Sequence, residues 1–318
     1  MSTRALGLNY FKDDNCPVIL YRVDRKHEIT HEHDLTEINH YHDFVEIVII
    51  IDGQGVQVVE AHEYLVSAGD VFVLQGNQSH YFKEAGKVDI VNVMFEETKK
   101  INLIPDRIKQ LEGYNALFIL EPNYRERDHF KNKLKLNREE LAKIESIINE
   151  MFQEMQNREE GYDIILRNRF QELIVLLCRH YTKIGSTEAR SLIRIGKVIE
   201  FLENNPDRKI YIKDMASLAN MSVRNFQRNF VRALGLSPIN YLIQVRLQRA
   251  RKLLRETDLK IMDIADITGF TDISHFIKCF KKYFKVTPYK YRMQFLNDIP
   301  PEMSSEAEPE IKLKGRAV

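Results

Sequence analysis

Residues 259–292 read LKIMDIADITGFTDISHFIKCFKKYFKVTPYKYR, and this stretch indicates the architecture of the C-terminal half because the chain contains a second version of it. Residues 261–271, IMDIADITGFT, align with residues 212–222, IKDMASLANMS, at an offset of 49 residues. The offset then becomes 50 and pairs Phe226 with Phe276, Phe230 with Phe280, Pro238 with Pro288, and Tyr241 with Tyr291. An internal repeat indicates a supersecondary unit that occurs twice.

Each copy has the pattern of a helix, a tight turn and a second helix. Ala216 and Ala265 are small residues at the positions where the two helices must cross closely. Asn220 and Gly269 follow four residues later, and both residue types tolerate the left-handed backbone of a tight turn. The Phe pairs, spaced i and i+4, would anchor the second helix to the core. The pattern predicts two helix-turn-helix units.

The opposite face of each second helix is then free to contact a partner. It carries Arg224, Asn225, Gln227 and Arg228 in the first copy, and Ile273, Ser274, His275 and Lys278 in the second. Arg pairs with guanine, Asn or Gln with adenine, and an apolar group with the thymine methyl. The alternative is a helical domain with a merely solvated basic face. Repetition of turn, core and exposed positions together favours binding to double-stranded DNA.

The charge distribution agrees with a nucleic-acid partner for one half of the chain. The 318 residues have a net charge of only +1, but residues 191–296 contain 20 Lys and Arg against 9 Asp and Glu. Residues 1–190 contain 24 against 32. The split indicates that the basic half meets a polyanion while the acidic half does something else. An Arg-rich helix predicted over residues 239–256 would hold the two reading helices ~34 Å apart on one face of DNA.

The segment 259–292 closely resembles the signature of AraC/XylS-type transcription regulators, and the resemblance extends over about residues 191–292. It implies two helix-turn-helix units that bind successive major grooves of promoter DNA and a contact with RNA polymerase. By position it assigns base reading to Arg224, Gln227 and Arg228, and in the second unit to Ile273, Ser274, His275 and Lys278. Lys285 stands where the family usually has Gly, so a less regular helix end is expected there.

The N-terminal half has the pattern of a small β-barrel between about residues 18 and 95. Short β-runs occur at Val45–Ile51, Gly55–Val59 and Val71–Leu74. Turns are predicted at Asp52-Gly53 and at Gly69-Asp70. Many short strands at close spacing are typical of a sandwich or a barrel.

Two helices are predicted after this barrel. The first begins after Asn137 and has one apolar stripe, formed by Leu141, Ile144, Ile148, Met151 and Met155. This stripe either packs on the chain's own barrel or forms the seam of a homodimer. The second spans about residues 164–181, with Phe170, Leu173, Ile174 and Leu177 on one side. We expect domains at 1–181 and 192–296, a polar linker at 182–191, and a disordered tail at 297–318.

The predicted barrel contains a group of histidines. HYHDFVEIVIIIDG, residues 40–53, places His40, His42, Phe44 and Glu46 on one face of a strand, and GDVFVLQGNQSH ends at His80. Both stretches resemble the two cupin motifs. The resemblance implies a cupin-like barrel and therefore an α+β protein of two domains, with appended helices on the barrel and an all-α domain of two helix-turn-helix units.

Three interpretations of the histidines remain open. In metal-binding cupins these positions hold a divalent ion, and the ligands here would be His40, His42, Glu46 and His80. Gln75, Asn77 and Glu84 depart from the enzyme pattern, and the cupin halves of these regulators mostly bind small effectors without a metal. Polar contacts to an effector are therefore favoured over a metal and over satisfied core histidines, and no cofactor is expected.

The resemblance also points to a particular effector. Residues 42–57, 64–82 and 116–122 look like the rhamnose-responsive members of the family. L-rhamnose is therefore the favoured effector. The predicted contacts are His40, His42, Phe44, Glu46, His80 and Tyr81, with Phe44 or Tyr81 stacked on the sugar ring.

The leading hypothesis is an activator of sugar-catabolism genes that is gated by its effector. The alternatives are a metal-dependent cupin enzyme with an attached DNA-binding domain, and an effector-independent regulator whose barrel only dimerises. We expect no enzyme, because the chain has no Ser-His-Asp or Cys-His arrangement and no phosphate-binding Gly loop. No apolar run approaches the ~18 residues of a spanning helix, and no signal peptide or CxxC spacing is present, so a cytoplasmic protein without a membrane partner is expected.

Overall fold

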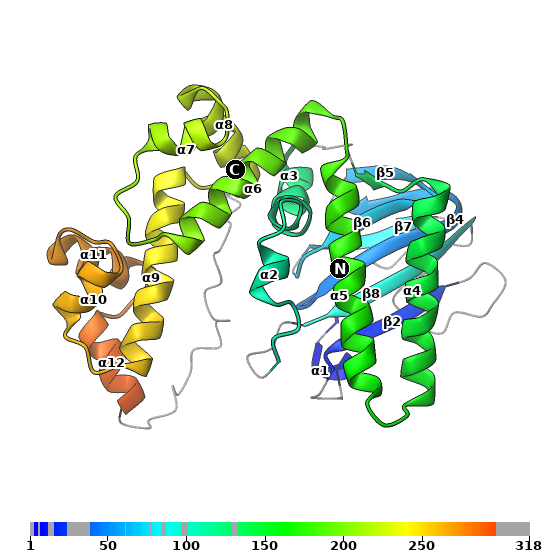
Figure 1. Ribbon diagram of the computed structural model, residues 1–318, viewed down its shortest axis with the longest axis horizontal. Coiled ribbons are helices and arrows are strands. Elements are labelled where there is room, and N and C mark those ends of the chain that lie inside the picture. Colours follow the sequence, from blue (N-terminus) through cyan, green and yellow to red (C-terminus); the bar gives the residue numbers. More distant parts are fainter. Residues whose placement is uncertain are drawn as a thin grey trace. The chain divides into compact units, whose positions relative to one another are not determined.

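A computed structural model describes residues 3–5, 7–11, 16–23, 39–60, 62–76, 78–83, 87–96, 101–128 and 133–296. The chain divides into two compact units, Met1–Gly196 and Lys197–Val318 (Figure 1). The predicted tail, Asn77 and Glu84 lie outside the described residues. None of the helices in the described ranges is long and apolar enough to cross a membrane.

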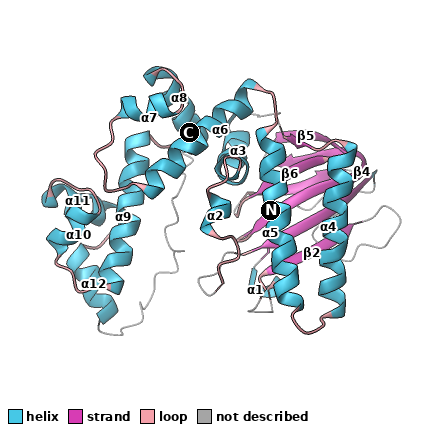
Figure 2. Ribbon diagram, in the orientation of Figure 1, coloured by secondary structure: helices cyan, strands magenta, loops and turns pink. Residues whose placement is uncertain are grey.

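The first unit is a β-structure covered by helices (Figure 2). Its strands are β1 (Thr3–Ala5), β2 (Val18–Val23), β3 (His40–His42), β4 (Val45–Val59), β5 (His62–Ser67), β6 (Asp70–Leu74), β7 (His80–Lys83), β8 (Val88–Phe95) and β9 (Leu134–Lys135). Its helices are α1 (Gly7–Tyr10), α2 (Asp106–Lys109), the π-helix η2 (Asn115–Leu120), α3 (Glu121–Asp128), α4 (Arg138–Asn157) and α5 (Tyr162–Thr182). Together with the helical second unit, this confirms the predicted α+β class.

Strand β4 connects two sheets. Its first half pairs with β6 and β8, whereas its second half pairs with β5 and β7. The change takes place at an irregular step between Ile50 and Asp52. The turn predicted at Asp52-Gly53 is therefore wrong, because the chain passes through it as one bent strand. Gly53 has a φ of +87°, and a Cβ there would meet the Lys87 carbonyl, so the bend requires glycine. The turn predicted at Gly69-Asp70 is confirmed.

The continuous strand predicted through residues 40–46 is also wrong, because it breaks at a bend at Asp43 and Phe44. The Asp43 carboxylate accepts a hydrogen bond from the Gly7 backbone N–H, with an Oδ1–N distance of 2.7 Å. β3 lies in the sheet of β1 and β7, whereas the start of β4 lies in the other sheet. The bend thus carries the chain from one sheet to the other.

Helices α4 and α5 lie side by side over one face of the sheet structure (Figures 1 and 2). Asn137 caps α4 in a reciprocal capping box with Glu140, which confirms the predicted start of this helix. Ile144, Ile148 and Met151 of the predicted stripe are buried, so the middle of the stripe is covered within the chain itself. All four predicted apolar residues of α5 are buried, and the ring of Phe170 lies 4.9 Å from that of Phe95 on β8.

Residues 187–191, which the polar composition assigned to a linker, are helical. They form the start of α6 (Thr187–Asn204), and only residues 183–186 separate this helix from α5. Ala189 and Leu192 are buried, and this three-residue spacing continues into the apolar face of the helix. The composition of a helix's first turn is often polar because capping residues gather there, so a polar stretch is compatible with the start of a helix.

The second unit confirms the duplicated helix-turn-helix. Its helices are α7 (Ile212–Leu218), α8 (Val223–Leu234), α9 (Pro238–Glu256), α10 (Ile261–Ile267), α11 (Ile273–Phe284) and α12 (Pro288–Leu296). The four anchoring phenylalanines are fully buried, as are Ala216 and Ala265 at the helix crossings. Ser237 caps α9 and is followed by Pro238 at its first turn, and this arrangement recurs at Thr287 and Pro288.

The turns of the two units differ in a way that explains their sequences. Asn220 and Gly269 both have positive φ, +49° and +87°, as predicted. A Cβ at Gly269 would lie only 2.7 Å from the Pro206 carbonyl oxygen. At the ends of the second helices, Lys285 has the same φ of +68° as Gly235. The helix end at Lys285 is therefore regular, contrary to expectation, although a non-glycine residue in this conformation costs roughly 1–2 kcal/mol.

Candidate DNA interface and polar cluster of the barrel

Helix α8 presents the predicted reading residues of the first unit. Ser222 caps the helix by accepting a hydrogen bond from the Asn225 N–H at 3.3 Å. Arg224, Gln227 and Arg228 are exposed, whereas Asn225 is half-buried. The Asn225 Oδ1 accepts hydrogen bonds from Arg228 Nη2 at 2.9 Å and from Asn229 Nδ2 at 3.0 Å. Asn225 therefore orients the Arg228 guanidinium along the helix.

Helix α11 presents the equivalent residues of the second unit. Asp272 caps it by accepting hydrogen bonds from the N–H groups of Ser274 and His275, at 2.9 and 3.2 Å. Ile273, Ser274, His275 and Lys278 are all exposed. The His275 Nε2 lies 3.3 Å from Cys279 Sγ, at the positions that Asn225 and Asn229 occupy in α8. Each reading helix thus holds one of its residues with a partner four residues on.

Val223 was missed by the sequence reasoning. It begins α8 as Ile273 begins α11, and the exposed fractions of the two side chains are 39% and 38%. The internal repeat could have identified Val223, because the offset of 50 residues pairs it with Ile273. An exposed apolar group at the start of a reading helix suits contact with a thymine methyl.

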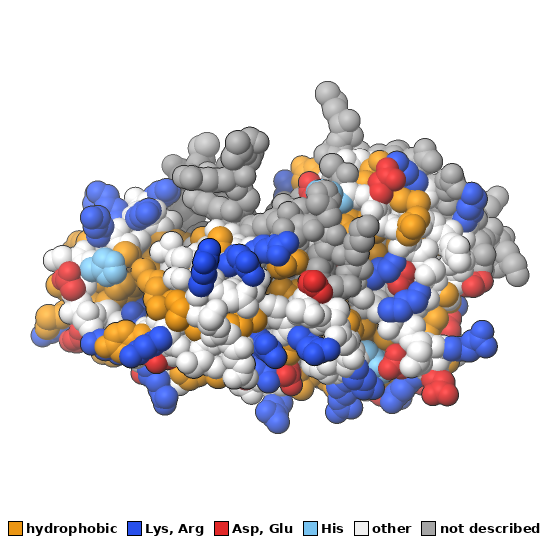
Figure 3. Space-filling view, turned by 90° about the horizontal axis from the view of Figure 1, so that it is seen from above, with side chains coloured by type: hydrophobic (Ala, Val, Ile, Leu, Met, Phe, Trp, Pro, Cys, Tyr) orange, Lys and Arg blue, Asp and Glu red, His pale blue; other side chains and the backbone are white. Residues whose placement is uncertain are grey.

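Basic side chains of the second unit have two different roles. Arg246 on α9 is half-buried and donates hydrogen bonds to the carbonyls of Pro206 and Arg208, at 2.7 and 2.9 Å. It therefore holds the loop that supports the turn at Gly269. In the space-filling view of the whole chain, Lys and Arg side chains are spread over the visible face among apolar ones (Figure 3). Exposed cations of this kind supply the phosphate contacts that dominate affinity for DNA.

The barrel brings three of its predicted polar residues into direct contact. Glu46 Oε2 lies 2.9 Å from His42 Nε2 and 3.2 Å from His80 Nε2. The exposed fractions of the three residues are only 1–3%. We call His42, Glu46 and His80 the Glu46 cluster. Residues from β3, β4 and β7 thus meet, because β3 and β7 are paired and β4 begins just after the bend.

The protonation of the Glu46 cluster follows from its backbone contacts. His42 Nδ1 lies 2.8 Å from the Phe44 carbonyl oxygen, and His80 Nδ1 lies 3.0 Å from that of Gln78. Because a carbonyl only accepts, both Nδ1 atoms donate and both Nε2 atoms face the Glu46 carboxylate. Each Nε2–Oε2 contact therefore requires a proton or another cation. Burial alone would raise the pKa of Glu46, but the hydrogen bonds with His42 and His80 outweigh it and hold the pKa far below its usual range.

The donor set of the cluster also suits a divalent metal. One ligand atom from each of the three residues lies within 4.8 Å of the others. Imidazole and carboxylate are common ligands of zinc, iron and manganese, and the Nδ1–carbonyl bonds are the outer contacts that orient metal-bound histidines. These three residues would hold such an ion, which would supply the positive charge that both contacts require. His40, the fourth predicted ligand, lies outside this group, and its ring centre is 4.3 Å from that of His80.

Phe44 and Tyr81 are the remaining predicted effector contacts. Phe44 is buried and its ring stacks on His42, with ring centres 4.2 Å apart, so it packs behind the cluster. Tyr81 follows His80 on β7 and therefore points to the opposite face of the strand. The prediction that Tyr81 stacks on a ligand beside the cluster is therefore not supported by this geometry.

Both units match known families. Residues 215–294 match a helix-turn-helix domain, and residues 25–174 match the AraC-like ligand binding domain. The HTH-type transcriptional activator RhaS of Enterobacter sp. (strain 638) is 28% identical over 253 residues, covering 80% of this chain and 86% of that protein.

Two solved structures are similar to about a third of the chain. An AraC-type transcriptional regulator from Chromobacterium violaceum is 30% identical and covers 33% of this chain and 94% of its own, with a TM-score of 0.32. The DNA-binding domain of AdpA, solved in complex with a target DNA, is 24% identical and covers 34% and 97%, with a TM-score of 0.33.

The two family matches fall separately on the two compact units. The chain is therefore a DNA-binding transcription regulator that carries its own ligand-binding domain. It belongs to the AraC family.

Proposed function

We propose that this regulator activates sugar-catabolism genes in response to a small sugar, and that L-rhamnose is the effector. The observation that carries the proposal is the presence, in one chain, of a duplicated DNA-reading surface and a barrel with a buried, charged polar cluster. A buried cluster of this kind offers directional hydrogen bonds to hydroxyl groups. The name of the RhaS activators, and the resemblance of the barrel motifs to rhamnose-responsive regulators, support the choice of sugar.

In this proposal the two reading helices divide the operator between them. Arg224, Gln227 and Arg228 read one major groove, and Ile273, Ser274, His275 and Lys278 read the next. Asn225 contributes by orienting Arg228. The protein acts as a homodimer and contacts RNA polymerase at the promoter. The domain limits of 1–181 and 192–296 belong to the same proposal, and limited proteolysis between α5 and α6 tests them.

The effector contacts are proposed on the Glu46 cluster with His40 beside it. Sugar hydroxyls both donate and accept. They can therefore donate to the Glu46 carboxylate and accept from the imidazole N–H groups of His42 and His80. Binding of this kind changes the contacts of β3, β4 and β7 together. By linkage, an effector that strengthens DNA binding must itself bind more tightly to the DNA complex.

The test starts from an operator obtained by selection on the full-length protein from random-sequence DNA. Fluorescence anisotropy then measures its affinity with and without L-rhamnose, with L-fucose and L-arabinose as comparisons. A several-fold change with L-rhamnose alone, matched by a change in transcription in vitro, supports the proposal. Unchanged affinity and unchanged transcription with every sugar would refute gating and favour a regulator whose barrel only dimerises.

A metal-dependent cupin enzyme is the second candidate, and the convergence of His42, Glu46 and His80 favours it. Elemental analysis of protein purified without chelators distinguishes the two. About one zinc, iron, nickel or manganese per chain would support a metal site, whereas a small fraction of one would exclude it.

A further inference from the structure

The interior face of the barrel contains two buried amides in addition to the Glu46 cluster. Gln57 lies on the second half of β4 and has an exposed fraction of 0%, and neither its Oε1 nor its Nε2 has a hydrogen-bond partner among the described residues. Asn92 lies on β8 with an exposed fraction of 3%, and its Oδ1 is likewise without a partner there. Buried amides are almost always hydrogen-bonded, so two such groups in one core require an explanation.

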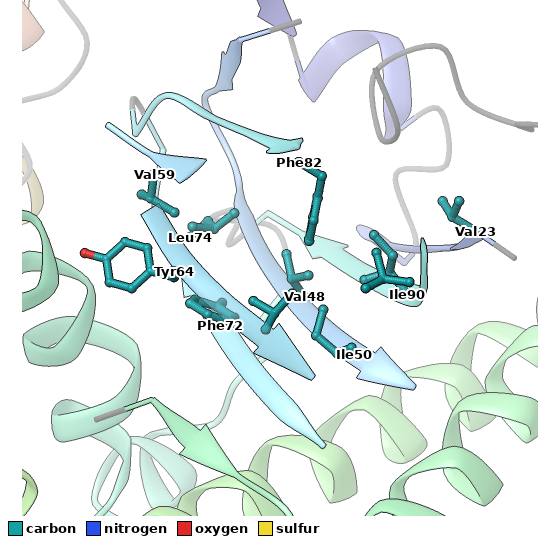
Figure 4. Packing of buried hydrophobic residues seen from close by; sticks show 11 residues of the cluster. Val23, Val48, Ile50, Val59, Tyr64, Phe72, Leu74, Phe82 and Ile90 are labelled. Carbon is teal, nitrogen blue, oxygen red and sulfur yellow. The ribbon is translucent and has the colours of Figure 1, made fainter. Parts of the chain in front are cut away.

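The strand register shows where both side chains point. Gln57 is paired directly with Tyr64 on β5 and with Phe82 on β7, and directly paired residues share one face. Asn92 is paired directly with Val48 on β4. Tyr64, Phe82 and Val48 belong to the hydrophobic cluster between the strands, whose side chains gather in Figure 4. Both amides therefore point into the barrel.

The same register places the two amides on either side of the Glu46 cluster. His80 is paired with Val59, so it is the diagonal neighbour of Gln57 on the adjacent strand. Glu46 is paired with Met94, so it is the diagonal neighbour of Asn92. Diagonal neighbours on one face lie about 7–8 Å apart, which is close to the width of a monosaccharide ring. Gln57, the Glu46 cluster and Asn92 therefore form one polar strip across the apolar interior.

The hydrogen-bonding groups of the strip indicate the class of ligand that it can bind. An amide both donates and accepts, and a hydroxyl does the same, so a ring with several hydroxyls satisfies both amides. The cations that reach this interior at Phe72 are paired with acids: Arg125 with Glu121, and Lys133 with Asp70. Each of these cations is balanced by an acid, and the two amides are themselves neutral groups that donate and accept, so the amides suit an uncharged, hydroxyl-bearing ligand.

We propose that Gln57 and Asn92 complete the effector site and make it specific for a neutral, hydroxyl-rich ring rather than for an acid. This inference rests on the proposed function, because it assumes that the Glu46 cluster binds the effector. In the absence of the effector, both polar atoms of the Gln57 amide and the Asn92 Oδ1 are held without partners among the residues that the structure describes. The unsatisfied amides thus lower the stability of the free protein, and they make the site selective when a ligand is bound.

The test is a pair of apolar substitutions, Gln57→Leu and Asn92→Leu, in the full-length chain. Each should raise the melting temperature of the free protein by about 2–4 °C, because an unsatisfied amide is removed. Each should also weaken L-rhamnose binding by about tenfold or more in calorimetry, because its hydroxyls lose a partner. Gln54→Leu, an exposed position on the same strand, is the matched control and should change neither quantity.

The outcomes separate the two proposals. If wild-type protein binds no sugar, the proposed function fails and takes this inference with it. If wild type binds L-rhamnose but both Leu variants bind it equally well, only this inference fails. A lower melting temperature in Gln57→Leu and in the volume-matched Gln57→Met would also overturn it, since the amide would then be structural. Equally tight binding of L-rhamnonate, the corresponding acid, would overturn the neutral class.

Discussion

At the scale of the residue, the turn of each helix-turn-helix shows how similar positions tolerate different side chains. Asn220 and Gly269 occupy equivalent turns with positive φ, and the sequence predicted this for both. It did not show that only Gly269 lies against the Pro206 carbonyl. That contact depends on Arg246 holding the loop of residues 206–208, which a local pattern does not show.

We therefore expect Gly269→Ala to destabilise the chain and Asn220→Gly to be tolerated. The alanine would combine a strained φ with a Cβ 2.7 Å from the Pro206 oxygen, and it should cost about 1–3 kcal/mol. Asn220→Gly should change stability by about 1 kcal/mol or less. Urea denaturation followed by circular dichroism measures both, and equal effects would show that the carbonyl contact is unimportant.

Arg228 provides a second prediction at this scale. Arg228→Ala should cost about 1–3 kcal/mol of specific binding and relax the preference at one base pair. An equal loss on all DNA sequences would mean that Arg228 contacts a phosphate instead.

Asn225→Ala should have a smaller effect of the same kind, because Asn225 orients Arg228. A double-mutant cycle measured by anisotropy should show that the two losses do not add. Full additivity would mean that Asn225 reads a base independently.

At the scale of the element, the helices could be predicted well and the strands less so. The stripe of α4 and its capping box are local in sequence, so periodicity located them. The course of β4 depends on partners as distant as Phe95 and Leu74, and on one glycine at a bend, so the sequence indicated a turn instead. For the same reason the pattern placed Phe44 on one continuous strand face with His42 and Glu46, whereas a bend interrupts that strand at Asp43 and Phe44.

The capping box of α4 gives a pH-dependent prediction. The Asn137 backbone N–H, followed by His180 and Lys183, lowers the pKa of Glu140 below its usual value of 4.5. A carboxylate with a lowered pKa stabilises the fold at pH values above about 4.5, and this contribution is lost as the pH falls through the pKa in the folded state.

Glu140→Gln keeps a side chain that can complete the capping box but removes the charge. The variant should be less stable than wild type by about 1 kcal/mol or less above pH 4.5, and the difference should shrink at lower pH. Urea denaturation at several pH values measures it. A difference that is independent of pH would assign the effect to packing.

At the scale of the whole molecule, the two units could be recognised because their sequence signals are different in kind. The helix-turn-helix sequence occurs twice in the second unit, so each position could be compared with its counterpart in the other copy. Of the eight predicted reading residues, all except the half-buried Asn225 are exposed. The sequence of the barrel showed only an alternation of apolar and polar residues and a few scattered histidines. Gln57 and Asn92 could not be identified as special, because only the register shows that they share an interior with Glu46.

The separation of the units predicts the effect of His42→Ala. This variant should weaken the response to L-rhamnose at least about tenfold while leaving non-specific DNA binding unchanged, because the second unit forms its own core. Dose–response curves of transcription in vitro, with binding to non-operator DNA as the control, measure both. Identical curves for variant and wild type would identify His42 as a core residue only.

The sharing of β4 between two sheets has a consequence for how the barrel comes apart. Neither sheet can separate from the other without breaking the ladder of this one strand, so the first unit lacks a natural line of partial opening through its centre. Local fluctuations should therefore be concentrated at its rims, which is where a ligand can enter, and the central ladder of β4 should be the last part of the barrel to open.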